Sequence, residues 1–151
     1  MSVEQRLVDL GITVPEVVPP VAAYVPAVRT GNLIYTSGQL PARDGAMIAV
    51  GKLGDAVDEE TGYECARQCA LNALAAIKAE IGSLDNVKRV VKAVVFVAST
   101  PDFTGQPKVA NGASEFLGEV FGEAGKHARS AVGVPVLPLD VPVEVELIVE
   151  V

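Results

Sequence analysis

The chain has 151 residues, enough to bury roughly two-thirds of its unfolded surface in one core, and nothing in it requires a second domain. Its formal charge is −7, from 12 basic and 19 acidic groups, and the scattered Lys and Arg residues argue against nonspecific nucleic-acid binding. The absence of a long uncharged apolar run excludes a transmembrane helix, and without a signal-peptide pattern at the N-terminus the expected location is the cytoplasm.

The N-terminal residues predict a short helix followed by an extended arm. Ser2, with Gln5 three residues later, forms a capping-box pattern, two leucines then share one face, and Gly11 ends the helix. The proline-rich stretch that follows favours extended backbone. We therefore expect residues 1–21 to form a helix and arm, and residues 22–151 to form a single domain.

Two short β-favouring runs then predict a hairpin. They cover Tyr24–Val28 and Asn32–Thr36, with a glycine-containing turn between them. Ser37 and Gly38 end the second strand, where a hydroxyl and free backbone N–H groups can point into a cleft; the alternative is an ordinary strand-end turn. The segment Pro41–Gly54 has little periodicity, which predicts a loop with at most one short strand.

Two long helices flank an apolar strand in the rest of the chain. The first helix follows the acidic residues Asp58–Glu60 and ends at Gly82, and the second follows Pro107. Between them, Arg89–Ala98 is apolar almost throughout. Two further strands are expected near residues 129–136 and 141–151.

The resulting order, β-β-α-β-α-β-β, predicts an α/β fold. Two βαβ-like passes that end in a hairpin would form one mixed sheet, with both long helices on the same face. The strand over residues 89–98 is apolar on both of its faces, and two helices can cover only one of them. Soluble monomers avoid such exposed apolar patches, so we expect a partner subunit to cover the other face.

Arg129 is a candidate anion-binding residue because it opens an apolar segment. A guanidinium there loses hydration, and its planar group of donors matches a carboxylate. One interpretation is an internal ion pair with Glu144 or Glu146 on the predicted neighbouring strand. The other is that Arg129 faces a cleft and holds the carboxylate of a ligand.

His127 is the only histidine of the chain. A lone histidine beside an arginine is typical of a hydrogen-bonding or capping residue, and a place at the mouth of the cleft is the alternative. The two cysteines, Cys65 and Cys69, fit small apolar helix residues better than a zinc site. We find no catalytic triad, metal-ligand cluster or dinucleotide fingerprint, so no metal or cofactor is expected.

Several segments taken together resemble the Rid (YjgF) family, also known as endoribonuclease L-PSP or translation-inhibitor-like proteins. Their order and spacing extend over roughly residues 22–151. The segments are Tyr24, Val28–Gln39, Asn72, Val90–Val97, Asp102–Phe103, Asn111, Ala128–Val132, Leu137–Pro138 and Val143–Glu146.

The resemblance implies a chorismate-mutase-like fold and a homotrimer whose sheets form a central barrel, with three clefts between subunits. In active members of the family, an arginine at the position of Arg129 clamps the carboxylate of the substrate. The positions matching Tyr24, Ser37, Asn111 and Glu144 line or support the same cleft. The further candidate substrate-binding residues are Gly38, His127 and Ser130.

The reaction of those members is hydrolysis of 2-imino or 2-enamino acids to 2-keto acids and ammonia, without a cofactor. Glu144 would orient or deprotonate the attacking water. This sequence has Ala131 where the deaminases often have a cysteine. The usual proline before the arginine is replaced by Ala128, which follows Gly125, Lys126 and His127. The alternatives are therefore a trimer that binds small carboxylates without catalysis and, less favoured by the acidic charge, an endoribonuclease.

Overall fold

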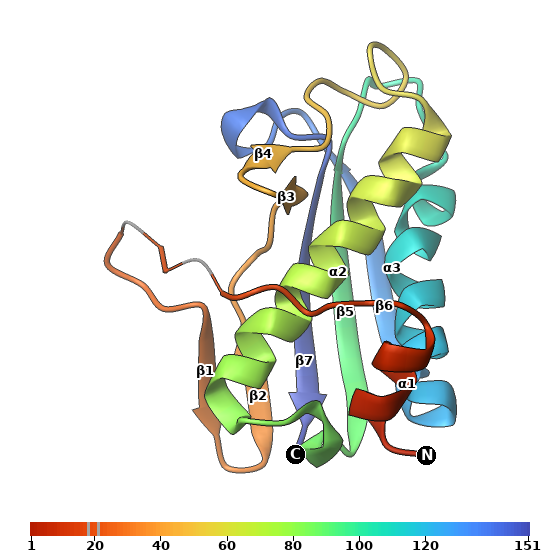
Figure 1. The fold of residues 1–151 in the computed structure, drawn as a ribbon. Coiled ribbons are helices and arrows are strands. Elements are labelled where there is room, and N and C mark those ends of the chain that lie inside the picture. The colour runs from red at the N-terminus through yellow and green to blue at the C-terminus, as the bar shows by residue number, and fades with distance from the viewer. Residues whose placement is uncertain (18, 21) are drawn as a thin grey trace.

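The structure, a computed structural model, describes residues 1–17, 19–20 and 22–151 (Figure 1). Part of the predicted arm, residues 18 and 21, lies outside the described residues. One five-stranded sheet packs against two long helices. In chain order the elements are α1 (Val3–Asp9), β1 (Ala27–Thr30), β2 (Leu33–Thr36), β3 (Ala42–Arg43), β4 (Ala46–Met47), α2 (Glu59–Ile81), the 3-10 turn η1 (Leu84–Asn86), β5 (Arg89–Ala98), α3 (Gln106–Phe121), η2 (Gly122–Gly125), β6 (Ala128–Val134), η3 (Pro138–Asp140) and β7 (Val143–Glu150).

The strand order in the sheet is β1-β2-β7-β5-β6, and only β5 and β6 run parallel. The predicted terminal hairpin is therefore wrong. Strand β7 lies between β2 and β5, while β6 forms an edge of the sheet. Helix α3 crosses over the sheet, so the chain returns as β6 in the same direction as β5. Strand β7 is buried at every second residue, and it takes the place between β2 and β5.

Two boundaries at the start of the domain also differ from the prediction. Strand β1 begins after Pro26, which has no N–H to donate, so Tyr24 precedes the sheet. The segment predicted as a loop with at most one strand contains the small β3–β4 hairpin. Its turn residues, Asp44 and Gly45, have positive φ angles of 54° and 82°, and an Asp-Gly pair is a recognised hairpin signal that the prediction overlooked.

Both long helices cover the same face of the sheet, as expected (Figure 1). Burial alternates along β7, because the valines and the leucine at odd positions from 143 to 149 face the helices. The opposite face carries apolar side chains of several strands. Val132 and Tyr35 are each 43% exposed there. The β3–β4 hairpin and the residues around η3 pack against one end of that face, near Phe96.

The two long helices are in close contact at Gly112. A Cβ atom at this position would collide with the backbone carbonyl oxygen of Tyr63, so only glycine permits the contact. Cross-helix polar contacts flank it: the Tyr63 hydroxyl donates to Glu115, and Arg67 pairs with Glu119 at 3.0 Å. The close contact at Gly112 and the polar contacts beside it therefore hold α3 against α2.

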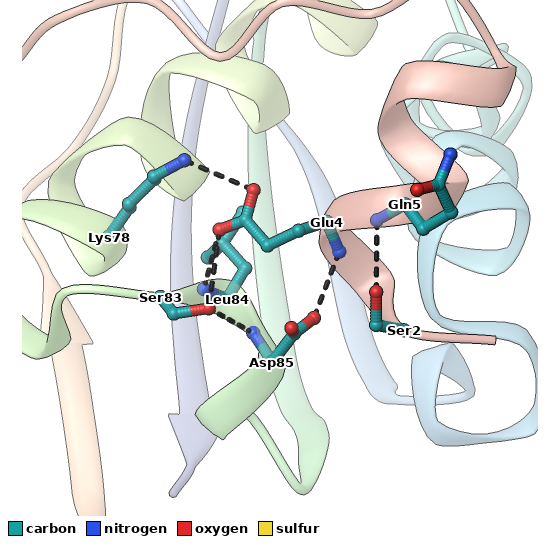
Figure 2. A network of polar contacts seen from close by, with 7 residues as sticks. All are labelled: Ser2, Glu4, Gln5, Lys78, Ser83, Leu84 and Asp85. Carbon is teal, nitrogen blue, oxygen red and sulfur yellow. Dashed lines mark hydrogen bonds and ion pairs between the residues drawn. The ribbon is translucent and has the colours of Figure 1, made fainter.

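Helix α1 docks on the turn after α2 through Glu4 (Figure 2). The backbone N–H of Glu4 donates to Asp85 Oδ1 at 2.9 Å, and its carboxylate accepts the N–H of Leu84 at 3.0 Å and pairs with Lys78 Nζ at 3.1 Å. Ser2 caps the helix by accepting the N–H of Gln5. This is half of the predicted capping box, since the Gln5 side chain donates to an aspartate of its own helix instead.

A matched pair of glycine substitutions in α3 tests the helix contact. Gly112→Ala should lower the free energy of unfolding by roughly 1–3 kcal/mol, because the new methyl group overpacks the interface with α2. Gly118→Ala should raise it by about 0.5–1 kcal/mol, because its Cβ meets no atom within 4 Å and alanine restricts the unfolded chain. Urea unfolding at one fixed protein concentration measures both. Equal effects of the two variants would contradict the packing described here.

Candidate functional site

Arg129 projects toward the helix-covered side of the sheet, at its β6 edge. It lies in register with Ala93, which is also paired with the buried Leu147, so all three side chains share one face. Helix α3 supplies the partners of the guanidinium. Nη1 donates to Asn111 Oδ1 at 2.8 Å and to Ser114 Oγ at 3.2 Å. Both acceptors are neutral, so the guanidinium is oriented and its charge is not cancelled.

His127 joins the same network through Ser114. The imidazole Nδ1 lies 2.6 Å from the carbonyl oxygen of Gly125, and Nε2 lies 2.9 Å from Ser114 Oγ. A carbonyl can only accept, so Nδ1 carries a proton. In the neutral ring, Nε2 then accepts the hydroxyl proton of Ser114. The hydrogen bonds thus run from Arg129 to Ser114, on to His127 and on to Gly125.

A pocket of about 340 Å³ opens beside this network. Two glycines shape it. A side chain on Gly125 would collide with the backbone of α3, so glycine there lets η2 pass close to the helix, whereas Gly118 faces open space. The lining residues are Ser114, Gly118, Gly125, Lys126, His127 and Arg129.

The interpretation of Arg129 as an internal ion pair with Glu144 or Glu146 is wrong. Strand β5 separates β6 from β7, and Glu144 is in register with Phe96, on the face opposite to Arg129. Among the described residues, none of the ion pairs includes Arg129. The charge of the guanidinium remains available to a ligand.

Glu144 belongs to a second group, built where the chain bulges after β2. Gln39 pairs with Val145, and the two residues before it, Ser37 and Gly38, stand opposite a single residue of β7. A Cβ atom on Gly38 would collide with the Glu144 carboxylate, so the glycine creates the space for that group. The Ser37 hydroxyl donates to the carbonyl oxygen of Val25 at 2.6 Å and ties down the chain before β1.

The environment of Glu144 suits acid–base chemistry. Burial of the half-buried side chain raises the pKa of its carboxyl group above the ordinary value of 4.5, and the nearby negative charge of Glu146 raises it further. A carboxyl group that holds its proton more readily can take a proton from water and return it.

The remaining predicted residues lie apart from Arg129 within one chain. Ser130 is in register with Val94, which also pairs with Glu146, so the side chain of Ser130 lies on the face away from the helices. Tyr24 lies before β1 and is 58% exposed. Thus Arg129, Asn111 and His127 form one group, whereas Ser37, Gly38 and Glu144 form another.

The prediction from sequence missed Ser114, which links Arg129 to His127. Its position three residues after Asn111 was the available signal, because residues at that spacing share one face of a helix. A hydroxyl on the face of α3 that turns toward β6 indicates a polar partner on that strand.

Other classes of site find no support in the part of the chain that the structure describes. No group of three or more His, Cys, Asp or Glu side chains could hold a metal ion there. Both cysteines are buried, and burial raises the pKa of the Cys65 thiol to about 11 and that of Cys69 well above its usual range, as expected of small apolar residues. None of the helices in the described residues has the length and apolar character to cross a membrane.

Comparison with known proteins decides the family. Residues 4–151 match the family model described as "YjgF/chorismate_mutase-like, putative endoribonuclease". The chain belongs to this YjgF family. The resemblance inferred from the motifs is therefore confirmed, and the sheet with its helices is the chorismate-mutase-like fold.

Relatives of the chain extend over nearly its whole length. It is 46% identical over 149 residues to protein TCP17 of Trypanosoma cruzi, covering 98% of this chain and 93% of the relative. The solved structure of Atu1372, a protein of unknown function from Agrobacterium tumefaciens, has 45% identity and a TM-score of 0.92, covering 99% and 92% of the two chains. A 2-iminobutanoate/2-iminopropanoate deaminase of Dermatophagoides farinae is 32% identical over 140 residues, covering 91% and 93%.

The raised pKa of Glu144 predicts how stability depends on pH. When the pKa of an acid is raised by folding, the favourable contribution is present below the ordinary pKa and is lost as the pH rises. We therefore expect Glu144→Gln to be more stable than the parent chain at about pH 7. The difference in the free energy of unfolding should shrink as the pH falls toward 4.5. Thermal unfolding across this range measures it.

A companion variant separates the two causes. Glu146→Gln removes the neighbouring charge but not the burial, so the pKa of Glu144, followed by NMR, should fall only partway toward its ordinary value. A Glu144→Gln variant that is less stable than the parent at neutral pH would contradict this account.

Proposed function

We propose that the protein binds small carboxylates at Arg129 and hydrolyses 2-imino or 2-enamino acids to 2-oxo acids and ammonia. The observation that carries the proposal is the state of Arg129: its Nη1 is held by the neutral partners Asn111 and Ser114, and it borders a pocket. A guanidinium fixed in this way, without a carboxylate partner among the described residues, matches a ligand carboxylate. Similarity to the mite deaminase supports the choice of reaction.

The proposal includes assembly into a homotrimer, because one chain does not bring the two groups together. Arg129 faces the helices at the sheet edge, whereas Glu144 lies on the uncovered face. That face exposes apolar side chains, including Val132 and Tyr35, which favours burial against another copy. If the uncovered face of one copy meets the β6 edge of the next, then Arg129 and Glu144 of different subunits share a cleft.

The chemistry needs only water and a proton carrier. With the substrate carboxylate on Arg129, the imine carbon is held next to a water molecule. The oxygen of the water bonds to that carbon, Glu144 accepts a proton of the water, and the imine nitrogen gains a proton. Glu144 then returns its proton to the amino nitrogen of the resulting carbinolamine, and the hydroxyl group gives up its proton to solvent. The C–N bond breaks, the C=O bond forms, and ammonia leaves. The hydrolysis involves no net oxidation or reduction, so no oxidant or reductant is required.

Ammonia release tests the proposal, with 2-aminoacrylate and 2-iminobutyrate generated in the assay by a dehydratase. The protein should accelerate loss of the imine above its spontaneous hydrolysis. Arg129→Ala should lower kcat/KM by about a hundredfold or more, because the carboxylate loses a charged bidentate contact. Arg129→Lys is the matched control: it keeps the charge without the planar group of donors, so its activity should lie between the two.

The same preparations distinguish catalysis from simple binding. Acceleration that survives in Arg129→Ala would contradict the role of Arg129. A protein that is stabilised thermally by 2-oxo acids but never accelerates imine loss would be a carboxylate-binding member of the family, and the hydrolase proposal would be wrong.

A further inference from the structure

The pocket beside Arg129 concentrates positive charge in an otherwise acidic protein. Arg129, Lys126 and His127 all line it, and its other lining residues are a serine and two glycines. The whole chain carries a net charge of −7, yet none of the residues that line this pocket is acidic. A single ligand carboxylate would occupy Arg129 and leave the ammonium group of Lys126 without a ligand anion.

His127 is held in one orientation within that wall. The bond of its Nδ1 to the carbonyl of Gly125 and the contact of Nε2 with Ser114 together fix the ring. Both ring nitrogens are thereby engaged within the chain, so the ring has no free N–H to donate to a ligand. The imidazole therefore forms a fixed wall of the pocket, and the cation available to a second anionic group is Lys126.

Lys126 is able to exchange its present partner for a ligand. Its contact with Glu123 is 3.0 Å long, but both side chains are highly exposed, 74% and 88% respectively. Exposed ion pairs of this kind contribute little to stability, so an anion in the pocket can replace Glu123.

The absence of a side chain at Gly118 keeps the pocket open. A Cβ atom at Gly118 would meet nothing within 4 Å, so the space beside it belongs to the pocket. The volume of about 340 Å³ lies at the lower end of the usual range for ligand sites, roughly 300–1,000 Å³. It suits a short-chain acid with two charged ends better than a large metabolite.

We propose that the substrates of this protein are dianionic: acids whose 2-oxo or 2-imino carboxylate binds Arg129 and whose second acidic group binds Lys126, beside the fixed ring of His127. This rests on the proposed function for the first carboxylate. The second contact is independent of the reaction, because it selects among ligands whether or not they are hydrolysed.

Calorimetric titration of the full chain with two product-like acids tests the proposal. 2-Oxoglutarate and 2-oxopentanoate have the same number of carbon atoms, but only the first has a second carboxylate. We expect 2-oxoglutarate to bind about fivefold more tightly at low salt, since one largely exposed charge contact is added. The preference should decrease as salt is raised.

Three variants locate the second contact. Lys126→Met should reduce the preference to about twofold or less while 2-oxopentanoate still binds. Lys108→Met removes the same charge from an exposed position near the start of α3 and should leave the preference unchanged. Gly118→Leu fills the pocket and should weaken both ligands.

Two results would overturn the inference: equal affinity of the parent protein for the two acids, or an undiminished preference in Lys126→Met. The proposed function fails separately, if Arg129→Ala binds 2-oxopentanoate as tightly as the parent does. The ratio of affinities therefore tests the second contact, and the Arg129 variant tests the first.

Discussion

The placement of β7 between β2 and β5 is the constraint on which the rest of the structure depends. It gives the most regularly apolar strand two hydrogen-bonded neighbours and directs its odd-numbered side chains into the core beneath the helices. The same placement moves β6 to the edge and puts a strand between Arg129 and Glu144. A single topological choice therefore builds the core and separates the guanidinium of Arg129 from the carboxyl group of Glu144, whose pKa is raised.

In the proposed trimer, this separation gives the uncovered face of the sheet a role. Its apolar side chains are then buried against another copy, and Glu144 meets the arginine of that copy. Glycines at Gly38 and Gly118 keep both halves of the site open. Ser114 adds a feature specific to the arginine half, since it couples the guanidinium to His127 and so to the shape of the adjoining pocket.

Sequence predicted the long elements well because their signals are local. The caps and apolar spacing around α2 and α3, and the apolar run of β5, follow from propensity and burial within each segment. The strand order did not follow, since the choice between a terminal hairpin and an inserted β7 depends on contacts distant in sequence. Arg129, Asn111 and His127 were predicted and do lie together, but the link through Ser114 depended on how α3 is rotated over β6.

The central claim is that Arg129 of one subunit acts with Glu144 of another, and mixed oligomers test it most directly. Arg129→Ala and Glu144→Gln are each assayed alone and then after equal amounts are unfolded and refolded together. The account predicts that each variant alone is nearly inactive, and that random mixing restores about a quarter of the sites, those with an intact arginine from one chain and an intact glutamate from its neighbour. A mixture that is confirmed to contain both chains yet is no more active than the separate variants would contradict it.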